Sequence, residues 1–439
     1  MMTQALYFLN FMLKPIRIYI AVYFSFYTVD AHAYLDPGTG SMLLSATLGV
    51  VFTLFYLIKG FYYKLVSLLY KLVGLNFKHK LSHGLVFYSE GKQYWNTFRP
   101  TIEALDKLNI KLTYLTSDEN DAGLHYESPN MTSQFIGTGN KAYTFLNMLE
   151  ADVCVMTTPG LDVLQIRRSK GVKHYAHIIH APTDAGIYKL FSFDYYDSVL
   201  CSGEHQIKSI RFLEALRNTE PKLLLKTGCP YMDVLGHKRA NSKNISVNEK
   251  NRILIAPTWG INGSLQRFGI KLIKPLLEAG YQVLIRPHPQ SYMVEKEIIE
   301  SIKSELKEYS NLSWDSNADG FMALSNTDLM ISDLSGVVFD YAFIFEKPVI
   351  SIKSELNLLG TEANDLPYDV WELGILNQVG QCIEADEIET LPKLIAKLLA
   401  DNNQAGHLSS LRDQHIYNYM TSGEVAAKQL LKIQMSVQV

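Results

Sequence analysis

A short loop, "RPHP" at 286–289, carries two groups that can bind an anion. It follows the apolar run "GYQVLI", which is typical of a buried β-strand. Proline fixes its own φ and disfavours helix in the residue before it, so the loop is stiff. Arg286 and His288 can each donate hydrogen bonds to phosphate or carboxylate oxygens. The sequence therefore predicts an anion-binding loop at the end of this strand.

A second polar loop lies within "ISDLSGVVFDYAFIF" at 331–345, between a predicted strand and a helix-like apolar run. An N-cap role, which contributes about 1 kcal/mol, accounts for only one of Ser332, Asp333 and Ser335. Gly336 lets the backbone approach a ligand closely, and a helix N-terminus binds phosphate through its free N–H groups. We therefore expect these four residues to bind phosphate.

A third loop ends the strand in "HIIHAPTD" at 177–184. His177 lies inside the strand and is predicted to be a core residue. His180 lies at the strand end, where a histidine of near-neutral pKa is suited to act as a general base. Asp184 either orients this histidine or caps the next helix, and we favour the cap.

Two further loops, "APTWG" at 256–260 and "TGCPYMD" at 227–233, also follow predicted strands. Thr258 is expected to bind ligand, and Asp233 can accept hydrogen bonds from a substrate or a neighbouring loop. No convincing D-x-D loop, H-x-x-E-H or C-x-x-C motif occurs, so we predict no metal and no cofactor.

From residue 84 onward, short apolar runs alternate with amphipathic stretches, a pattern that indicates parallel, doubly wound sheets. The polar segment 241–251 separates two such series and is predicted to be a linker, and "LDVLQIRRS" (161–169) is predicted to be helical. Strands are expected at 84–89, 110–116, 152–158, 173–182, 197–203, 222–230, 252–259, 281–289, 327–333 and 347–352. The tail, 386–434, is predicted to contain only helices. Two α/β domains of this kind bind ligands beyond the carboxyl ends of their strands.

The first eighty residues have the features of a membrane segment. Residues 1–33 are predicted to be a signal peptide or a first transmembrane helix, because an apolar stretch ends in an A-x-A arrangement. Residues 41–58 carry no charge and are long enough to cross a bilayer. Several lysines follow them before the next acidic residue: Lys59, Lys64, Lys71, Lys78 and Lys80. The positive-inside rule then places the rest of the chain on the cytoplasmic side of the inner membrane.

The composition is that of a globular protein, and it fits neither a disordered chain nor a nucleic-acid-binding arm. The 439 residues are 47% hydrophobic and have a formal net charge of −3, so no nucleic-acid partner is predicted. The four cysteines are far apart and are expected to be reduced thiols.

Four motifs in the order "GCPYMD", "APTW", "RPHP" and "SDLSG" resemble the CDP-glycerol glycerophosphotransferases of teichoic-acid polymerase and primase type. The resemblance covers roughly residues 150–400 and implies a GT-B arrangement of two Rossmann-like domains around a cleft. We expect an acceptor-side domain at 81–245 and a CDP-donor-side domain with a helical tail at 246–439, after a membrane region at 34–80.

The resemblance also implies roles for individual residues. His180 matches the family's proposed base, and His288 matches a histidine that contacts the donor phosphates. Ser332, Asp333 and Ser335 match the donor loop, and Asp233 matches a family acid. Arg286, Thr258 and Gly336 are expected beside the same donor. Tyr231 and Gly260 stand where the family commonly has arginine, so the donor implied is CDP-glycerol or a related CDP-polyol.

The implied reaction moves glycerol phosphate from CDP-glycerol to a hydroxyl of a lipid-linked acceptor at the membrane and releases CMP. Two alternatives remain from the sequence. One is a GT-B glycosyltransferase that uses a nucleotide sugar, and the other is a catalytically inactive GT-B scaffold at the membrane.

Overall fold

The computed structural model describes residues 84–242, 251–317, 319–354, 358–401 and 403–438. The predicted membrane segments at 1–33 and 34–80 and most of the predicted linker lie outside these residues. Within these ranges we find no helix that combines the length and apolar character needed to cross a bilayer.

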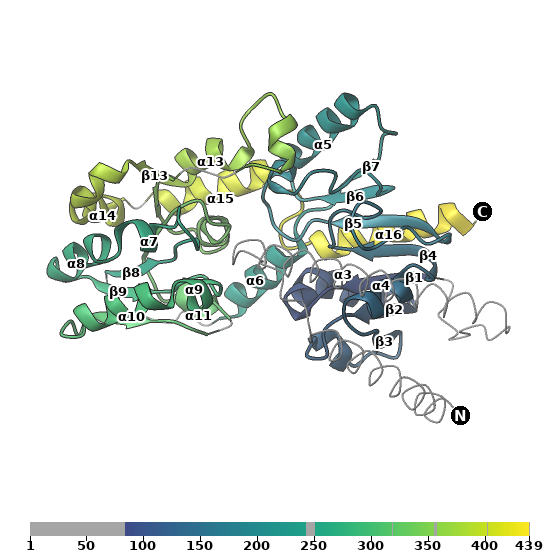
Figure 1. Ribbon diagram of the computed structural model, residues 1–439, viewed down its shortest axis with the longest axis horizontal. Coiled ribbons are helices and arrows are strands. Elements are labelled where there is room, and N and C mark those ends of the chain that lie inside the picture. The colour runs from purple at the N-terminus through teal and green to yellow at the C-terminus, as the bar shows by residue number, and fades with distance from the viewer. Residues whose placement is uncertain (1–83, 243–250, 318, 355–357, 402, 439) are drawn as a thin grey trace, which may run out of the picture. The chain divides into compact units, whose positions relative to one another are not determined.

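The first domain is built on seven parallel strands in the order β3-β2-β1-β4-β5-β6-β7 (Figure 1). From β1 the chain first moves outward to β3 and then returns to place β4 on the other side of β1. The topological switch point therefore lies between β1 and β4. The strands are β1 (Leu85–Ser89), β2 (Leu112–Thr116), β3 (Met131–Phe135), β4 (Glu150–Met156), β5 (Gly171–Ile178), β6 (Ser198–Cys201) and β7 (Leu223–Lys226).

The second domain repeats this topology with six parallel strands in the order β10-β9-β8-β11-β12-β13. Its switch point lies between β8 and β11, which pair directly. The strands are β8 (Arg252–Ile255), β9 (Gln282–Ile285), β10 (Leu312–Trp314), β11 (Leu329–Ser332), β12 (Val349–Ile352) and β13 (Gly380–Ile383). The prediction of two α/β domains with parallel sheets is confirmed.

Helices cover both faces of each sheet, which explains why the central strands read as continuous apolar runs. Every residue of β1, β11 and β12 is buried. The helices of the first domain are α3 (Trp95–Lys107), α4 (Asn140–Leu146), α5 (Glu204–Arg217) and α6 (Pro230–Asn241), with short turns η1 (Lys92–Tyr94), η2 (Ala122–His125) and η3 (Ala185–Ile187). Those that follow are α7 (Ser264–Phe268), α8 (Ile270–Glu278), α9 (Ser291–Val294), α10 (Lys296–Glu305), α11 (Phe321–Ser325), α12 (Val337–Phe339), η4 (Asp340–Ile344), η5 (Glu362–Asp365), α13 (Trp371–Val379), η6 (Ala385–Thr390), α14 (Leu391–Ala400), α15 (Gln404–His415) and α16 (Ser422–Gln438).

The last helix, α16, returns to the first domain, although the sequence groups it with the second. Ala426, Ala427, Leu430 and Ile433 lie on one side of the helix and belong to the core cluster of the first sheet. Figure 1 shows α16, in yellow, beside α3, and the two helices are in extensive contact. Full burial of a side chain such as Leu430 contributes about 1.5–3 kcal/mol, so packing rather than chain order decides where α16 lies.

The structure also corrects local predictions. Residues 161–169 form turns rather than the predicted helix. Three strands were not predicted, namely β3, β10 and β13, and all three lie at sheet edges. Edge strands are only partly buried, so their sequences lack the apolar run that marks the central strands.

Candidate active site

The loops after β8 and β11 are tied together at the switch point of the second domain. The buried Asp333 carboxylate accepts backbone N–H groups from Thr258 and Ser264, each at 2.8 Å. The Ser332 hydroxyl donates to the Ala256 carbonyl at 2.6 Å. Burial raises the pKa of Asp333, and the two N–H donors oppose that rise. Asp333 and Ser332 therefore shape the loop that carries Thr258.

The "RPHP" loop lies beside the same site. The rings of His288 and Trp259 lie 6.3 Å apart, which places this loop against "APTWG". His288 Nδ1 accepts the Gln290 N–H at 3.2 Å, and burial lowers the pKa of His288. A neutral imidazole that accepts at Nδ1 carries its proton on Nε2. His288 can thus donate one hydrogen bond to a ligand.

Arg286 follows β9, and Ser335 and Gly336 follow β11. The Arg286 guanidinium pairs with Asp315, which follows the neighbouring strand β10 and holds the guanidinium in place. Gly336 is exposed, and a Cβ added there would meet no described atom within 4 Å. The space in front of Gly336 is therefore open to a ligand.

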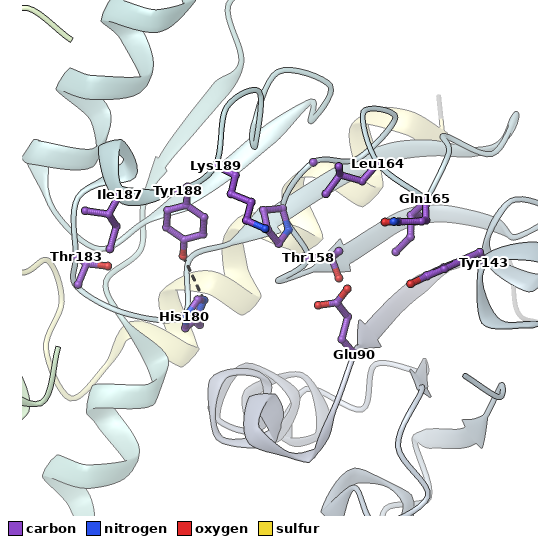
Figure 2. A pocket seen from close by; sticks show the side chains of 13 residues that line it. Glu90, Tyr143, Thr158, Leu164, Gln165, His180, Thr183, Ile187, Tyr188 and Lys189 are labelled. Atoms are coloured by element: carbon purple, nitrogen blue, oxygen red, sulfur yellow. Dashed lines mark hydrogen bonds between the residues drawn. The ribbon is translucent and has the colours of Figure 1, made fainter. Parts of the chain in front are cut away.

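His180 lies in a separate pocket of the first domain, shown in Figure 2. Its Nδ1 is 3.2 Å from the Tyr188 hydroxyl, and the Tyr94 and Tyr188 rings lie 5.4 and 6.0 Å from its ring. Burial lowers the pKa of His180, so the imidazole is neutral at neutral pH. If Nδ1 donates its proton to Tyr188, Nε2 is left as a base.

The pocket has a volume of about 440 Å³ and lies at the carboxyl ends of β1, β4 and β5. It is also lined by Glu90, Thr158 and Lys189, which the sequence analysis missed. Glu90 directly follows β1, and Thr158 lies two residues after β4, so the strand-end rule could have identified both. Lys189 and Tyr188 follow no strand end and carry no comparable signal.

A shared wall connects the two sites. Thr183 and Ile187 line the pocket of His180, and they also line a smaller cavity of about 110 Å³. Ser335 and Gly336 line the same small cavity. The segment that contains Thr183 and Ile187 therefore borders both the pocket of His180 and the cavity of Ser335 and Gly336.

Asp184 and Asp233 lie away from these ligand-facing groups. The Asp184 carboxylate caps η3 by accepting the Gly186 N–H at 2.8 Å, and it also accepts the Trp371 N–H at 3.0 Å. The Asp233 carboxylate accepts from three groups at the start of α16: the Met420 and Gly423 N–H groups and the Ser422 hydroxyl. Asp184 therefore joins the two domains, and Asp233 anchors the last helix.

His177 lies in the core. It is fully buried among the Tyr188, Phe193 and Tyr196 rings, and burial lowers its pKa to about 3. Among the residues that the structure describes, no group of three or more His, Cys, Asp or Glu side chains is arranged to hold a metal ion.

Two Rossmann-type domains with ligand-facing loops at both switch points define a GT-B-like architecture. The family model for CDP-glycerol:poly(glycerophosphate) glycerophosphotransferases matches residues 79–416, so the chain belongs to this family of transferases. No curated protein sequence matches the chain significantly.

Solved structures support the same fold. Two structures of a histidine-to-asparagine variant of the wall teichoic acid polymerase TagF, soaked with CDPG, share 17% identity with this chain. They cover 87% of it and 99% of their own chains, with TM-scores of 0.51 and 0.54. A Neisseria meningitidis UDP-GlcNAc 2-epimerase bound to UDP-GlcNAc shares 11% identity, covers 80% of this chain and 100% of its own, and has a TM-score of 0.51. At these identities the likeness concerns the fold alone.

Proposed function

We propose that this protein is a membrane-associated transferase that moves glycerol phosphate, or a similar polyol phosphate, from CDP-glycerol to a hydroxyl of a lipid-linked acceptor. The observation that carries the proposal is the shared wall between the His180 pocket and the donor loop, in a chain of this family. That arrangement supports a reaction between groups bound to different domains.

The second domain would bind the donor. Its pyrophosphate would lie between the Ser335–Gly336 backbone and the "RPHP" loop, with His288 donating from Nε2. The prolines and the Asp315 contact hold Arg286 and His288 before the ligand arrives, so little ordering entropy is lost on binding. Thr258, whose backbone is held by Asp333, would stand beside the nucleotide.

The first domain would supply the base. The acceptor hydroxyl gives its proton to Nε2 of His180, and its oxygen attacks the β-phosphorus of CDP-glycerol. A new oxygen–phosphorus bond forms, the bond from that phosphorus to the bridging oxygen breaks, and CMP leaves with the electron pair. Arg286 and His288 stabilise the charge that develops on the leaving group.

The acceptor would be presented at a membrane. The lysine-rich run from Lys59 to Lys80, which lies outside the described residues, follows an uncharged apolar stretch at 41–58. Basic residues of this kind are attracted to anionic lipid headgroups, and they would bring the catalytic domains to the cytoplasmic face of the membrane.

The test is transfer of radiolabelled glycerol phosphate from CDP-glycerol to a lipid extract, with CMP release followed in parallel. We expect label in the lipid or polymer fraction, and we expect His180→Ala to abolish it. CMP release without labelled lipid would point to hydrolysis and oppose the proposed acceptor. Failure with CDP-glycerol but turnover of a nucleotide sugar would favour a glycosyltransferase, and nucleotide binding without any turnover would favour a scaffold.

A further inference from the structure

The segment that carries the candidate base takes part of its shape from the second domain. Residues 180–192 lie between β5 and β6, so the hydrogen bonds of the first sheet do not fix them. Near the end of this segment, the Leu190 N–H donates to the Gly360 carbonyl at 3.2 Å, and the Ser192 N–H donates to the Glu362 carboxylate at 3.0 Å. Because buried backbone groups are nearly always hydrogen-bonded, these partners from the second domain decide the course of the segment.

Residues 360–362 form a strap that runs along this segment. Thr361 forms an antiparallel bridge with Lys189. Beside this bridge, the Glu362 N–H donates to the Tyr188 carbonyl at 2.8 Å. Antiparallel pairing fixes which residues lie directly opposite each other. The strap therefore fixes the position of the Tyr188 backbone.

Glu362 has the most contacts of the three strap residues. Its side chain is fully buried, and its carboxylate accepts the Ser192 N–H and pairs with Arg217 of α5. Arg217 also pairs with Asp194 at 2.9 Å and with Asp365 at 2.7 Å. A buried carboxylate is stable only with partners of this kind, because burial removes its hydration. The position of the strap is therefore tied to α5 of the first domain.

Tyr188 connects the strap to His180. Its hydroxyl lies 3.2 Å from Nδ1 of His180, as the dashed line in Figure 2 shows. The two rings also pack edge to face, with their centres 6.0 Å apart. An imidazole that accepts a proton at Nε2 needs a partner at Nδ1 to hold the ring in one orientation. Contacts from Glu362 through Tyr188 thus lead from the second domain to the candidate base.

We propose that Glu362 is a positioning residue for His180. By fixing the segment that contains Tyr188, it holds the imidazole of the first domain in the orientation that proton transfer requires. The base is then correctly placed only while the strap of the second domain is in contact with the first. This inference rests on the proposed function, in which His180 takes the proton of the acceptor hydroxyl.

The first experiment needs no transfer activity. Diethyl pyrocarbonate acylates neutral imidazole nitrogens, and mass spectrometry of peptides gives the rate at each histidine of the full-length protein. In Glu362→Ala we expect His180 to react at least fivefold faster than in the wild type, because a displaced Tyr188 covers its ring less. The exposed His125 is the internal reference and should react at the same rate in both proteins.

Asp365→Ala is the matched control. It removes a carboxylate from the same Arg217 guanidinium, but within the described chain Asp365 makes no hydrogen bond to residues 180–192. We expect the reactivity of the base and kcat to stay within about twofold of the wild type. Glu362→Gln keeps one oxygen that can accept the segment's N–H, so its effect should lie between those of Glu362→Ala and Asp365→Ala.

Transfer kinetics provide the second experiment. Glu362→Ala should lower kcat about tenfold, while the Kd for CDP-glycerol, measured by calorimetry, stays within about twofold of the wild type and shows that the second domain is folded. Because burial lowers the pKa of His180, access of water to the ring brings the pKa nearer to its ordinary 6.5. The acid limb of kcat/KM should therefore move to higher pH, which a loss of stability alone would not cause. The other titratable side chains around the ring remain in this variant: Glu90, Tyr94, His177, Tyr188 and Lys189.

The outcomes separate this inference from the proposed function. Unchanged reactivity of His180 in folded Glu362→Ala, or equal changes in Glu362→Ala and Asp365→Ala, would overturn the positioning role. Faster reaction of His180 together with an unchanged kcat would overturn it too, since the orientation of the ring would not limit transfer. Faster reaction of His180 in Glu362→Ala, in a protein whose wild type transfers nothing from CDP-glycerol, would support the link between strap and histidine and refute the proposed function.

Discussion

The two domains share a topology but organise their switch points differently. In the second domain, the buried Asp333 carboxylate holds backbone N–H groups, so the loop geometry forms the site. In the first domain, side chains such as His180, Glu90 and Thr158 line an open pocket. The shared fold thus sets where the loops meet, while the loop sequences set which backbone and side-chain groups face the two sites.

The two domains are also joined by contacts of Glu362, a residue of the second domain, with the first domain. The Glu362 N–H donates to the Tyr188 carbonyl at 2.8 Å, and the Glu362 carboxylate accepts the Ser192 N–H at 3.0 Å. Arg217 of α5 pairs with Glu362. A loop of the second domain therefore holds the segment of the first domain that contains Tyr188, the neighbour of His180.

The largest expected effect is that of His180→Ala, which should slow the chemical step without weakening the binding of the donor. His180→Ala should lower kcat by about 10²–10⁴-fold, because the general base is lost, while the Kd for CDP-glycerol stays near the wild-type value. Steady-state kinetics and calorimetry measure the two quantities. His125→Ala, at an exposed histidine of the same domain, is the matched control. A variant with near-wild-type kcat would show that another group removes the proton.

Arg217→Ala tests the link between the domains. Arg217 is 10% exposed and Glu362 is fully buried, so removing the arginine leaves an unpaired buried carboxylate. We expect a loss of about 3–5 kcal/mol in the free energy of unfolding, measured by urea denaturation. Arg99→Ala breaks an exposed ion pair with Glu103 and should cost less than about 1 kcal/mol. If both variants lose the same free energy of unfolding, the buried Arg217–Glu362 pair contributes no more to stability than the surface pair Arg99–Glu103.

His288→Ala is expected to weaken the binding of CDP-glycerol, whereas His180→Ala is expected to lower kcat. Loss of one hydrogen bond to a charged phosphate should cost about 1.5–3 kcal/mol and raise the Kd for CDP-glycerol roughly 10- to 100-fold. Calorimetry with CDP-glycerol checks the prediction, and an unchanged donor affinity would remove His288 from the proposed donor site.

Asp333→Asn tests whether the hydrogen bonds from Thr258 and Ser264 to Asp333 are needed for the binding site of the second domain. The amide replaces one carboxylate oxygen by an NH₂ group, which cannot accept the N–H of Thr258 or Ser264. We expect a loss of about 1–3 kcal/mol in stability together with weaker CDP-glycerol binding. A stability loss with unchanged donor affinity would restrict Asp333 to a structural role.

The pH profile gives the smallest effect and reports on the first site. His180 must be deprotonated to act as a base, and burial lowers its pKa below the ordinary 6.5. The kcat/KM should therefore be constant at neutral pH and fall as pH decreases below 6.5. A fall that begins above pH 7 would contradict a neutral, buried His180.

The sequence by itself determined the two α/β domains, because central strands buried on both faces must be continuous apolar runs. It also predicted His180, Arg286, His288, Ser332 and Asp333 as site residues, since each lies at or just after the end of such a run. Three of the four edge strands, β3, β10 and β13, were not predicted, because partial exposure removes the apolar run. Only the tertiary structure assigned Asp233 to the anchoring of α16, because its partners at Met420, Ser422 and Gly423 are far away in the chain.

The pocket of His180 was likewise decided by the tertiary structure. Glu90, Thr158 and Lys189 come from three separate loops, and no spacing in the sequence relates them. The parallel order β1-β4-β5 brings the ends of these strands to one edge, and the Glu362 loop holds Tyr188 beside His180. Local sequence sets which residues end a strand, whereas strand order sets which strand ends meet.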